Sequence, residues 1–107
     1  MIVTAWNNSR HHESGAGYGL KVSVEDRDRF FHRHWDTVLL ELEGRGTPVA
    51  VNINKDSFWG PMCRELISRE IGQWLRENGY SPWPKGRPPK FVMEPLGGNR
   101  FVVRMRS

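Results

Sequence analysis

The chain has little of what secreted and membrane proteins require. Its only cysteine, Cys63, cannot form an internal disulfide bond, whereas small secreted domains often carry several such bonds. No stretch approaches the roughly 20 apolar residues of a membrane span, and the first residues lack the apolar run of a signal peptide. These absences predict a cytoplasmic protein that has no membrane partner.

Hydrophobic residues are also scarce, since they make up 37% of the 107 residues. A chain of this length forms one domain, so we expect residues 1–107 to share a single compact core. Aromatic rings can fill such a core, and the chain has five tryptophans, five phenylalanines and two tyrosines. Tryptophan is favoured at subunit interfaces and in pockets, so this content predicts a homo-oligomer, most simply a homodimer, or a ligand pocket.

Acidic residues are nearly absent from the last quarter of the chain. Residues 80–107 contain six basic side chains and one acid, Glu94, whereas residues 1–79 contain ten basic and eleven acidic side chains. The net charge of +4 therefore comes entirely from the C-terminal quarter. Such an asymmetry favours an anionic partner, with nucleic acid first. The alternative is a solvated basic surface that serves solubility.

Short runs of alternating apolar and polar residues predict strands. Turn residues at 44–48 and at 95–99 join two pairs of these runs into hairpins. Ser23 is placed to cap a short helix that runs to about His34, with His34 on its buried side. The expected strands are 1–6, 20–24, 37–43, 49–54, 91–94 and 100–106.

The strongest periodic signal predicts a long helix over about 58–78, because apolar residues recur there at spacings of three and four. Cys63 falls on the buried stripe of this helix. Gly72 costs about 1 kcal/mol in mid-helix relative to alanine, so it indicates close approach of another backbone. Gly79 is placed to end the helix in a left-handed conformation.

The order of these elements, ββαββαββ, predicts an α+β fold. We expect a mostly antiparallel curved sheet, or an open pseudobarrel, of about six short strands with two helices.

Basic side chains gather in the connector 80–90 and in the last strand. A period of two places three arginines on one strand face, and the planar guanidinium group binds phosphate through two hydrogen bonds. Trp83 offers a stacking surface for an unpaired base. The predicted nucleic-acid contacts are Trp83, Lys85, Arg87, Lys90, Arg100, Arg104 and Arg106. In the alternative, the arginines form weak surface pairs with Glu41 and Glu43 of a neighbouring strand.

A second hypothesis places a ligand in an aromatic-lined pocket or interface. Its candidate residues are Phe58, Trp59, Tyr80 and Trp83. Phe58 and Trp59 begin the expected long helix, whereas Tyr80 and Trp83 follow its end. A pocket that they share therefore requires the connector to fold back or a second subunit to contribute. The alternative is that these rings belong to the core.

No pattern indicates catalysis, a metal or a cofactor. The four histidines form two close pairs whose spacing does not suit a shared metal ion. The glycine-rich run 15–19 precedes a strand, whereas a phosphate-binding glycine loop follows a strand and opens a helix. We therefore predict a small non-enzymatic protein that is nucleic-acid-binding or regulatory through its basic C-terminal quarter. The alternative is a homo-oligomeric module that binds a small molecule or a protein partner in an aromatic-lined pocket.

Overall fold

The computed structural model describes residues 1–106 and shows one seven-stranded mixed sheet with three helices. The strands lie in the order β4-β3-β7-β6-β1-β2-β5. In chain order the elements are β1 (Ile2–Asn7), β2 (Tyr18–Lys21), α1 (Val24–Phe30), β3 (Thr37–Leu42), β4 (Val49–Asn52), α2 (Asp56–Trp59), β5 (Glu65–Ile67), α3 (Arg69–Glu77), β6 (Lys90–Gly97) and β7 (Arg100–Met105).

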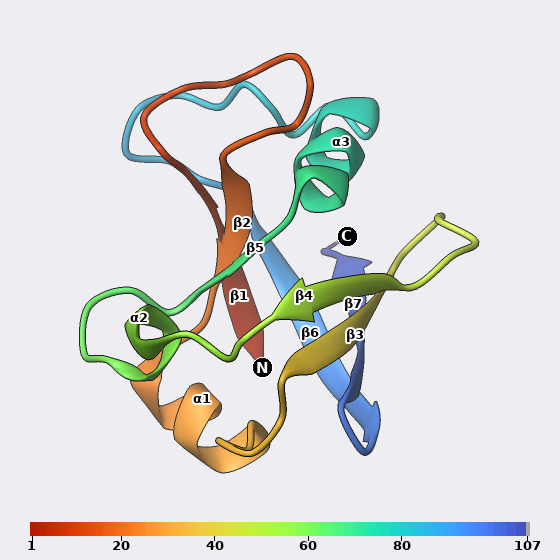
Figure 1. Ribbon diagram of the computed structural model, residues 1–107. Coiled ribbons are helices and arrows are strands. Elements are labelled where there is room, and N and C mark those ends of the chain that lie inside the picture. The colour runs from red at the N-terminus through yellow and green to blue at the C-terminus, as the bar shows by residue number, and fades with distance from the viewer. Residues whose placement is uncertain (107) are drawn as a thin grey trace.

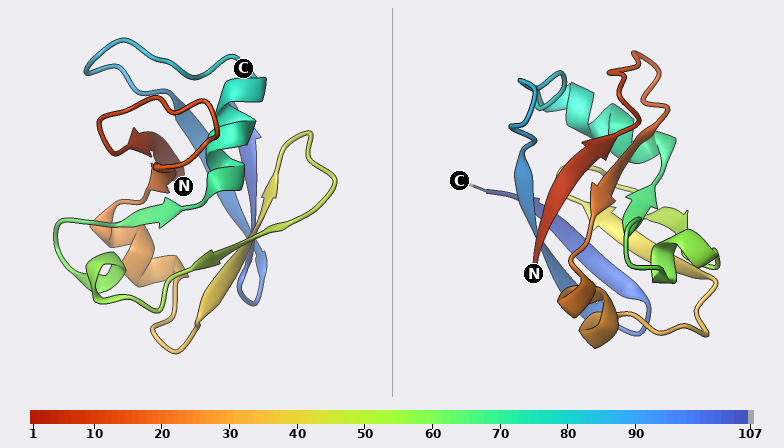
Figure 2. Two further views of the ribbon diagram at one scale, coloured as in Figure 1. Left: turned by 45° about the horizontal axis from the view of Figure 1, so that its top comes forward. Right: turned by 90° about the vertical axis from the view of Figure 1, so that its left-hand side faces the viewer.

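The sheet curls until its edge strands β4 and β5 approach each other, which makes it nearly closed (Figures 1 and 2). Five of its strand pairs are antiparallel, and β3 pairs with β7 in parallel. Helix α3 lies at one end of the curled sheet, and α1 and α2 lie at the other end (Figure 1). The predicted α+β class and curved, mostly antiparallel sheet are therefore confirmed.

The interior is filled by the alternate apolar residues of the strands. In β3, for example, Val38, Leu40 and Leu42 are buried, while the residues between them lie on the outer surface or are half-buried. Trp74 of α3 is also fully buried, and its indole Nε1 donates to the carbonyl of Glu43 at 2.7 Å. This bond fixes α3 over its end of the sheet.

The predicted long helix over 58–78 is wrong. The segment contains the short helix α2, the strand β5 and the nine-residue helix α3. Gly60 is extended at φ −82° and ψ 178°, and Pro61 cannot donate the next backbone bond, so α2 stops there. Ser68 then caps α3 by accepting a bond from the backbone of Glu70. Cys63 is consequently exposed and not buried.

The count of six strands and two helices is wrong for the same reason, because the interrupted segment supplies β5 and an additional helix. The short first helix also ends earlier than expected, at Phe30, since Phe31 is extended. His34 is exposed as a result, which corrects its expected burial. Ser23 caps this helix as predicted, through a 3.1 Å bond from the backbone of Asp26.

Gly72 marks a close approach of two backbones, as its sequence position indicated. A Cβ atom at this position would lie 2.1 Å from the carbonyl oxygen of Gly15. The loop between β1 and β2 therefore packs directly on α3, and Gln73 adds a 3.4 Å bond to the carbonyl of Ser14. Gly79 adopts the expected left-handed conformation after α3. Across residues 1–106, the helices are too short or too polar to cross a bilayer.

Candidate functional site

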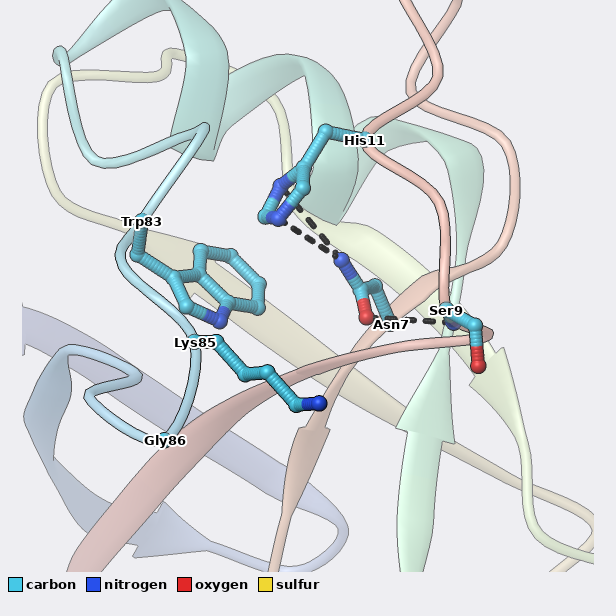
Figure 3. A pocket seen from close by; sticks show the side chains of 6 residues that line it. All are labelled: Asn7, Ser9, His11, Trp83, Lys85 and Gly86. Atoms are coloured by element: carbon cyan, nitrogen blue, oxygen red, sulfur yellow. Dashed lines mark hydrogen bonds between the residues drawn. The ribbon is translucent and has the colours of Figure 1, made fainter.

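Two loops that are distant in sequence meet at the α3 end of the sheet. They are the segment 8–17 between β1 and β2, and the connector 78–89 between α3 and β6 (Figure 1). A cavity of about 500 Å³ opens between them, within the range of roughly 300–1,000 Å³ that is usual for small-molecule sites. Its lining residues are Asn7, Ser9, His11, Trp83, Lys85 and Gly86, and we call it the Trp83 pocket (Figure 3).

Trp83 is positioned by the chain that precedes it. The backbone amides of Tyr80 and Ser81 both donate to the carbonyl of Leu75 in α3, at 2.8 and 3.3 Å, and a cis peptide bond follows Ser81. The half-buried indole of Trp83 contacts the His11 ring edge to face, with a centroid distance of 4.6 Å. These contacts hold one wall of the pocket in a defined orientation.

Next to Trp83, the lining continues as a hydrogen-bonded cluster around His11. Its Nδ1 lies 3.0 Å from the hydroxyl of Ser81 and 3.3 Å from that of Tyr18, and these two hydroxyls share a short hydrogen bond. The amide nitrogen of Asn7 lies 3.3 Å from Nε2 of His11. Because Tyr18 is fully buried and Ser81 nearly so, the cluster joins the pocket to the core. The imidazole is therefore held in place before any ligand arrives.

The rim of the pocket is polar and positively charged. Ser9 has a left-handed backbone at φ 77°, and its amide donates to Oδ1 of Asn7 at 3.2 Å. Lys85 and Gly86 lie in a turn closed by a 2.9 Å bond from the amide of Arg87 to the carbonyl of Pro84. The side chain of Lys85 runs along the pocket beside the indole (Figure 3). Among residues 1–106, those that line the pocket include a lysine and no acid, so the site can combine ring stacking with attraction of an anion.

The predicted cations do not all gather at this site. Lys85 lines the pocket, and Arg87 is exposed in the same connector. Lys90 begins β6 on the outer face of the sheet, where its Nζ donates to the hydroxyl of Thr4 at 3.2 Å.

The arginines of β7 are exposed on the outer face of the sheet and do not belong to the lining of the Trp83 pocket as described for residues 1–106. Arg100 pairs with Glu41 at 2.6 Å, and Arg104 pairs with Glu94 at 3.3 Å. Arg106 is exposed. The four paired side chains are about half exposed, so each pair contributes at most about 1 kcal/mol.

The four candidate aromatic residues are also separated. Phe58 is fully buried against Phe31, and Trp59 lies half-buried near α1, with its Nε1 donating to Ile53 at 2.9 Å. Tyr80 packs on Phe91 of the core, with ring centroids 4.9 Å apart. Of the four, Trp83 lines the pocket.

The remaining pocket residues, Asn7, Ser9, His11 and Gly86, were not predicted from sequence. Asn7 ends β1, Ser9 and His11 lie in the polar run that follows it, and Gly86 lies in the connector. None of these positions belongs to an apolar periodic pattern.

The histidines do not assemble a metal site. The rings of His32 and His34 have centroids 5.5 Å apart, beside Trp35. Within residues 1–106, no three side chains of histidine, cysteine, aspartate or glutamate lie close enough to hold a metal ion.

Comparison of the chain with protein-family models, with curated proteins and with solved structures finds no match. The functional argument therefore depends on the geometry of the Trp83 pocket and of the surfaces around it.

Proposed function

We propose that the protein binds single-stranded nucleic acid and takes one unpaired nucleotide into the Trp83 pocket. The observation that carries the proposal is the combination, in one cavity, of the Trp83 indole with the ammonium group of Lys85. Stacking of a base on an aromatic side chain contributes about 1–3 kcal/mol, and it tolerates any base. An ammonium group beside the stacked base suits the adjoining phosphate.

The polar lining supports a nucleotide over a purely apolar ligand. The amide of Asn7 and the hydroxyl of Ser9 can exchange hydrogen bonds with a base edge or a sugar. The rest of the connector extends the positive charge, because Arg87 follows Lys85 closely and is exposed. By contrast, Arg100 and Arg104 have carboxylate partners, so we assign the first phosphate contact to Lys85.

The test is fluorescence anisotropy of labelled single-stranded and double-stranded oligonucleotides, at low and at physiological salt. We expect micromolar or tighter binding to the single strand, with an affinity that falls as salt rises. Lys85→Glu should weaken this binding about tenfold, equivalent to about 1.4 kcal/mol, and should flatten the salt dependence.

The matched control is Lys55→Glu, which makes the same change of charge at the start of α2, at the other end of the molecule (Figure 1). It should leave the affinity nearly unchanged. Absence of binding at low salt would refute the proposal. Equal losses in the two variants would also refute it, because they would indicate attraction to net charge and not to the pocket.

A further inference from the structure

A second cavity lies on the outer face of β1, β2 and β6. It has a volume of about 430 Å³, and the residues that line it include Thr4 of β1, Lys21 of β2, Lys90 of β6 and Arg64. We call it the β1 groove. One carboxylate, that of Asp26, also lines it.

Strand register places the two lysines of the β1 groove on either side of Thr4. Thr4 is opposite Lys21 in one neighbouring strand and opposite Lys90 in the other. Directly paired residues have Cα atoms about 4.5–5.5 Å apart, so the two lysine Cα atoms lie about 10 Å apart across the strand. This spacing leaves room for a chain that follows β1 between two ammonium groups.

The two lysines differ in their partners. Lys90 donates to the neutral hydroxyl of Thr4. Lys21 forms a long ion pair with Glu65, with 4.0 Å between Nζ and Oε2, a distance at which no hydrogen bond forms and the ammonium protons can still be donated to an anion. That Glu65 oxygen is buried and has no hydrogen-bond partner within residues 1–106. The groove therefore differs from the face of β7, where Arg100 is already engaged by a carboxylate at 2.6 Å.

The groove and the Trp83 pocket lie along the same strand. Thr4 lines the groove and Asn7 lines the pocket, and a rise of about 3.3 Å per residue separates their Cα atoms by about 10 Å. That length corresponds to about three stacked nucleotides. Trp6 follows Thr4 on the outer face, half-buried and paired with Gly19, which has no side chain to cover it. Asn7 has the opposite orientation, so a bound chain that follows the outer face reaches the Trp83 pocket over the end of β1.

The connector between α3 and β6 lies against β1 on the side opposite β2. The amide of Ala5 in β1 donates to the carbonyl of Pro89 at 2.9 Å, so the end of the connector lies against the strand. From there the chain runs into Lys90 in one direction and back to Lys85 in the other. Positive charge therefore follows β1 from the groove to the pocket.

We propose that the outer face of β1 is the track for the rest of the bound strand. Trp6 stacks a second base, and Lys21 and Lys90 contact phosphates in the β1 groove. This inference rests on the proposed function, since it extends a strand whose end nucleotide occupies the Trp83 pocket.

The experiment measures anisotropy for thymidine oligonucleotides of 3, 6 and 12 nucleotides. Lys90→Glu should weaken binding of the 12-mer about tenfold and of the 3-mer less than twofold, whereas Lys85→Glu should weaken both. Lys90→Glu should also reduce the magnitude of the salt slope for the 12-mer by about 0.7, the value for one phosphate contact in a single strand. Lys55→Glu is again the matched control.

Two further variants separate the path from a structural effect. Lys21→Gln should weaken the 12-mer selectively without introducing a second acid beside Glu65. Trp6→Leu should do the same, with an unchanged melting temperature showing that the fold is intact.

If Lys90→Glu and Lys21→Gln leave the affinity for the 12-mer unchanged while Lys85→Glu lowers it, the proposed track along β1 is refuted and the proposed role of the Trp83 pocket is retained. If the unaltered protein binds none of the oligonucleotides, the proposed function and the track both fail.

Discussion

Replacing Gly72 by alanine is expected to destabilise the protein, although alanine is normally the better residue in a helix. A Cβ atom at Gly72 would lie 2.1 Å from the carbonyl oxygen of Gly15 and 2.6 Å from its Cα atom. Both contacts are with backbone, which cannot rotate away as a flexible side chain can. Gly15 is itself held at φ +87°, where a side chain would be strained, so the loop has little freedom to adjust.

The expected size follows from two opposing effects. Alanine gains about 1 kcal/mol over glycine in a helix interior. Forcing an additional methyl group into a closely packed site costs about 1–3 kcal/mol or more, and this contact lies at the severe end. We therefore expect a net loss of about 1–2 kcal/mol, which lowers the melting temperature of a domain of this size by about 4–8 °C.

The assay is urea denaturation together with a thermal melt, with Gly60→Ala as the control. Gly60 has φ −82°, and its nearest neighbour beyond the adjacent residues would be 3.5 Å from an added Cβ atom. This control should change the free energy of unfolding by no more than about 0.5 kcal/mol. A Gly72→Ala protein as stable as the unaltered one would refute the reasoning, because the loop would then have room to retreat at no cost.

Two further predictions concern the helices. The hydroxyl of Ser68 and the backbone amide of Glu70 hold the pKa of the Glu70 carboxyl below its ordinary value. The ionised carboxylate therefore stabilises the folded protein at neutral pH, and this contribution is lost as the pH falls through the folded-state pKa. Ser68→Ala should raise this pKa in an NMR titration, and an unchanged value would contradict the assignment. Arg27→Met leaves the carbonyls of Phe58 and Gly60 without their donor and should cost about 1–3 kcal/mol in urea denaturation, whereas Arg29→Met, on the exposed side of α1, should cost little.

The hairpins were predictable because the residues that specify their strands and turns lie close together in the sequence. Alternation marks β3 and β4, turn residues separate them, and the structure pairs Val38 with Val51 as that pattern requires. The glycines before Asn99 likewise marked the turn between β6 and β7. The parallel pairing of β3 with β7 had no local signal, since Leu40 and Phe101 lie far apart in the chain.

The long helix failed because two short elements reproduced its spacing by chance. Phe58 is buried from α2 and Leu66 from β5, and their separation of eight residues also fits one face of a continuous helix. Pro61 was compatible with a first helical turn, but the structure places it just after a helix end. Apolar periodicity alone could not separate these alternatives.

The candidate site was partly predictable for a related reason. Trp83 and Lys85 stood out by composition, because a tryptophan and a lysine lie among prolines in an aperiodic connector. Their neighbours Asn7 and His11 come from the other end of the chain. The loop that follows Asn7 and carries His11 reaches α3 through backbone packing at Gly15, which a sequence pattern does not encode.

The count of basic residues identified the basic C-terminal quarter of the chain. Where an anion can bind depends on which of these side chains already form ion pairs with carboxylates. Arg100 and Arg104 were the obvious candidates by spacing, and each of them meets a carboxylate across the sheet. Lys85 and Lys90 are less regular in sequence, yet they lie beside cavities and have no acidic partner within residues 1–106. A phosphate that binds these lysines displaces only water or a neutral hydroxyl, whereas one that binds Arg100 must compete with Glu41. If an anionic strand binds as proposed, we therefore expect Lys85 and Lys90 to contribute more of its binding energy than Arg100 and Arg104.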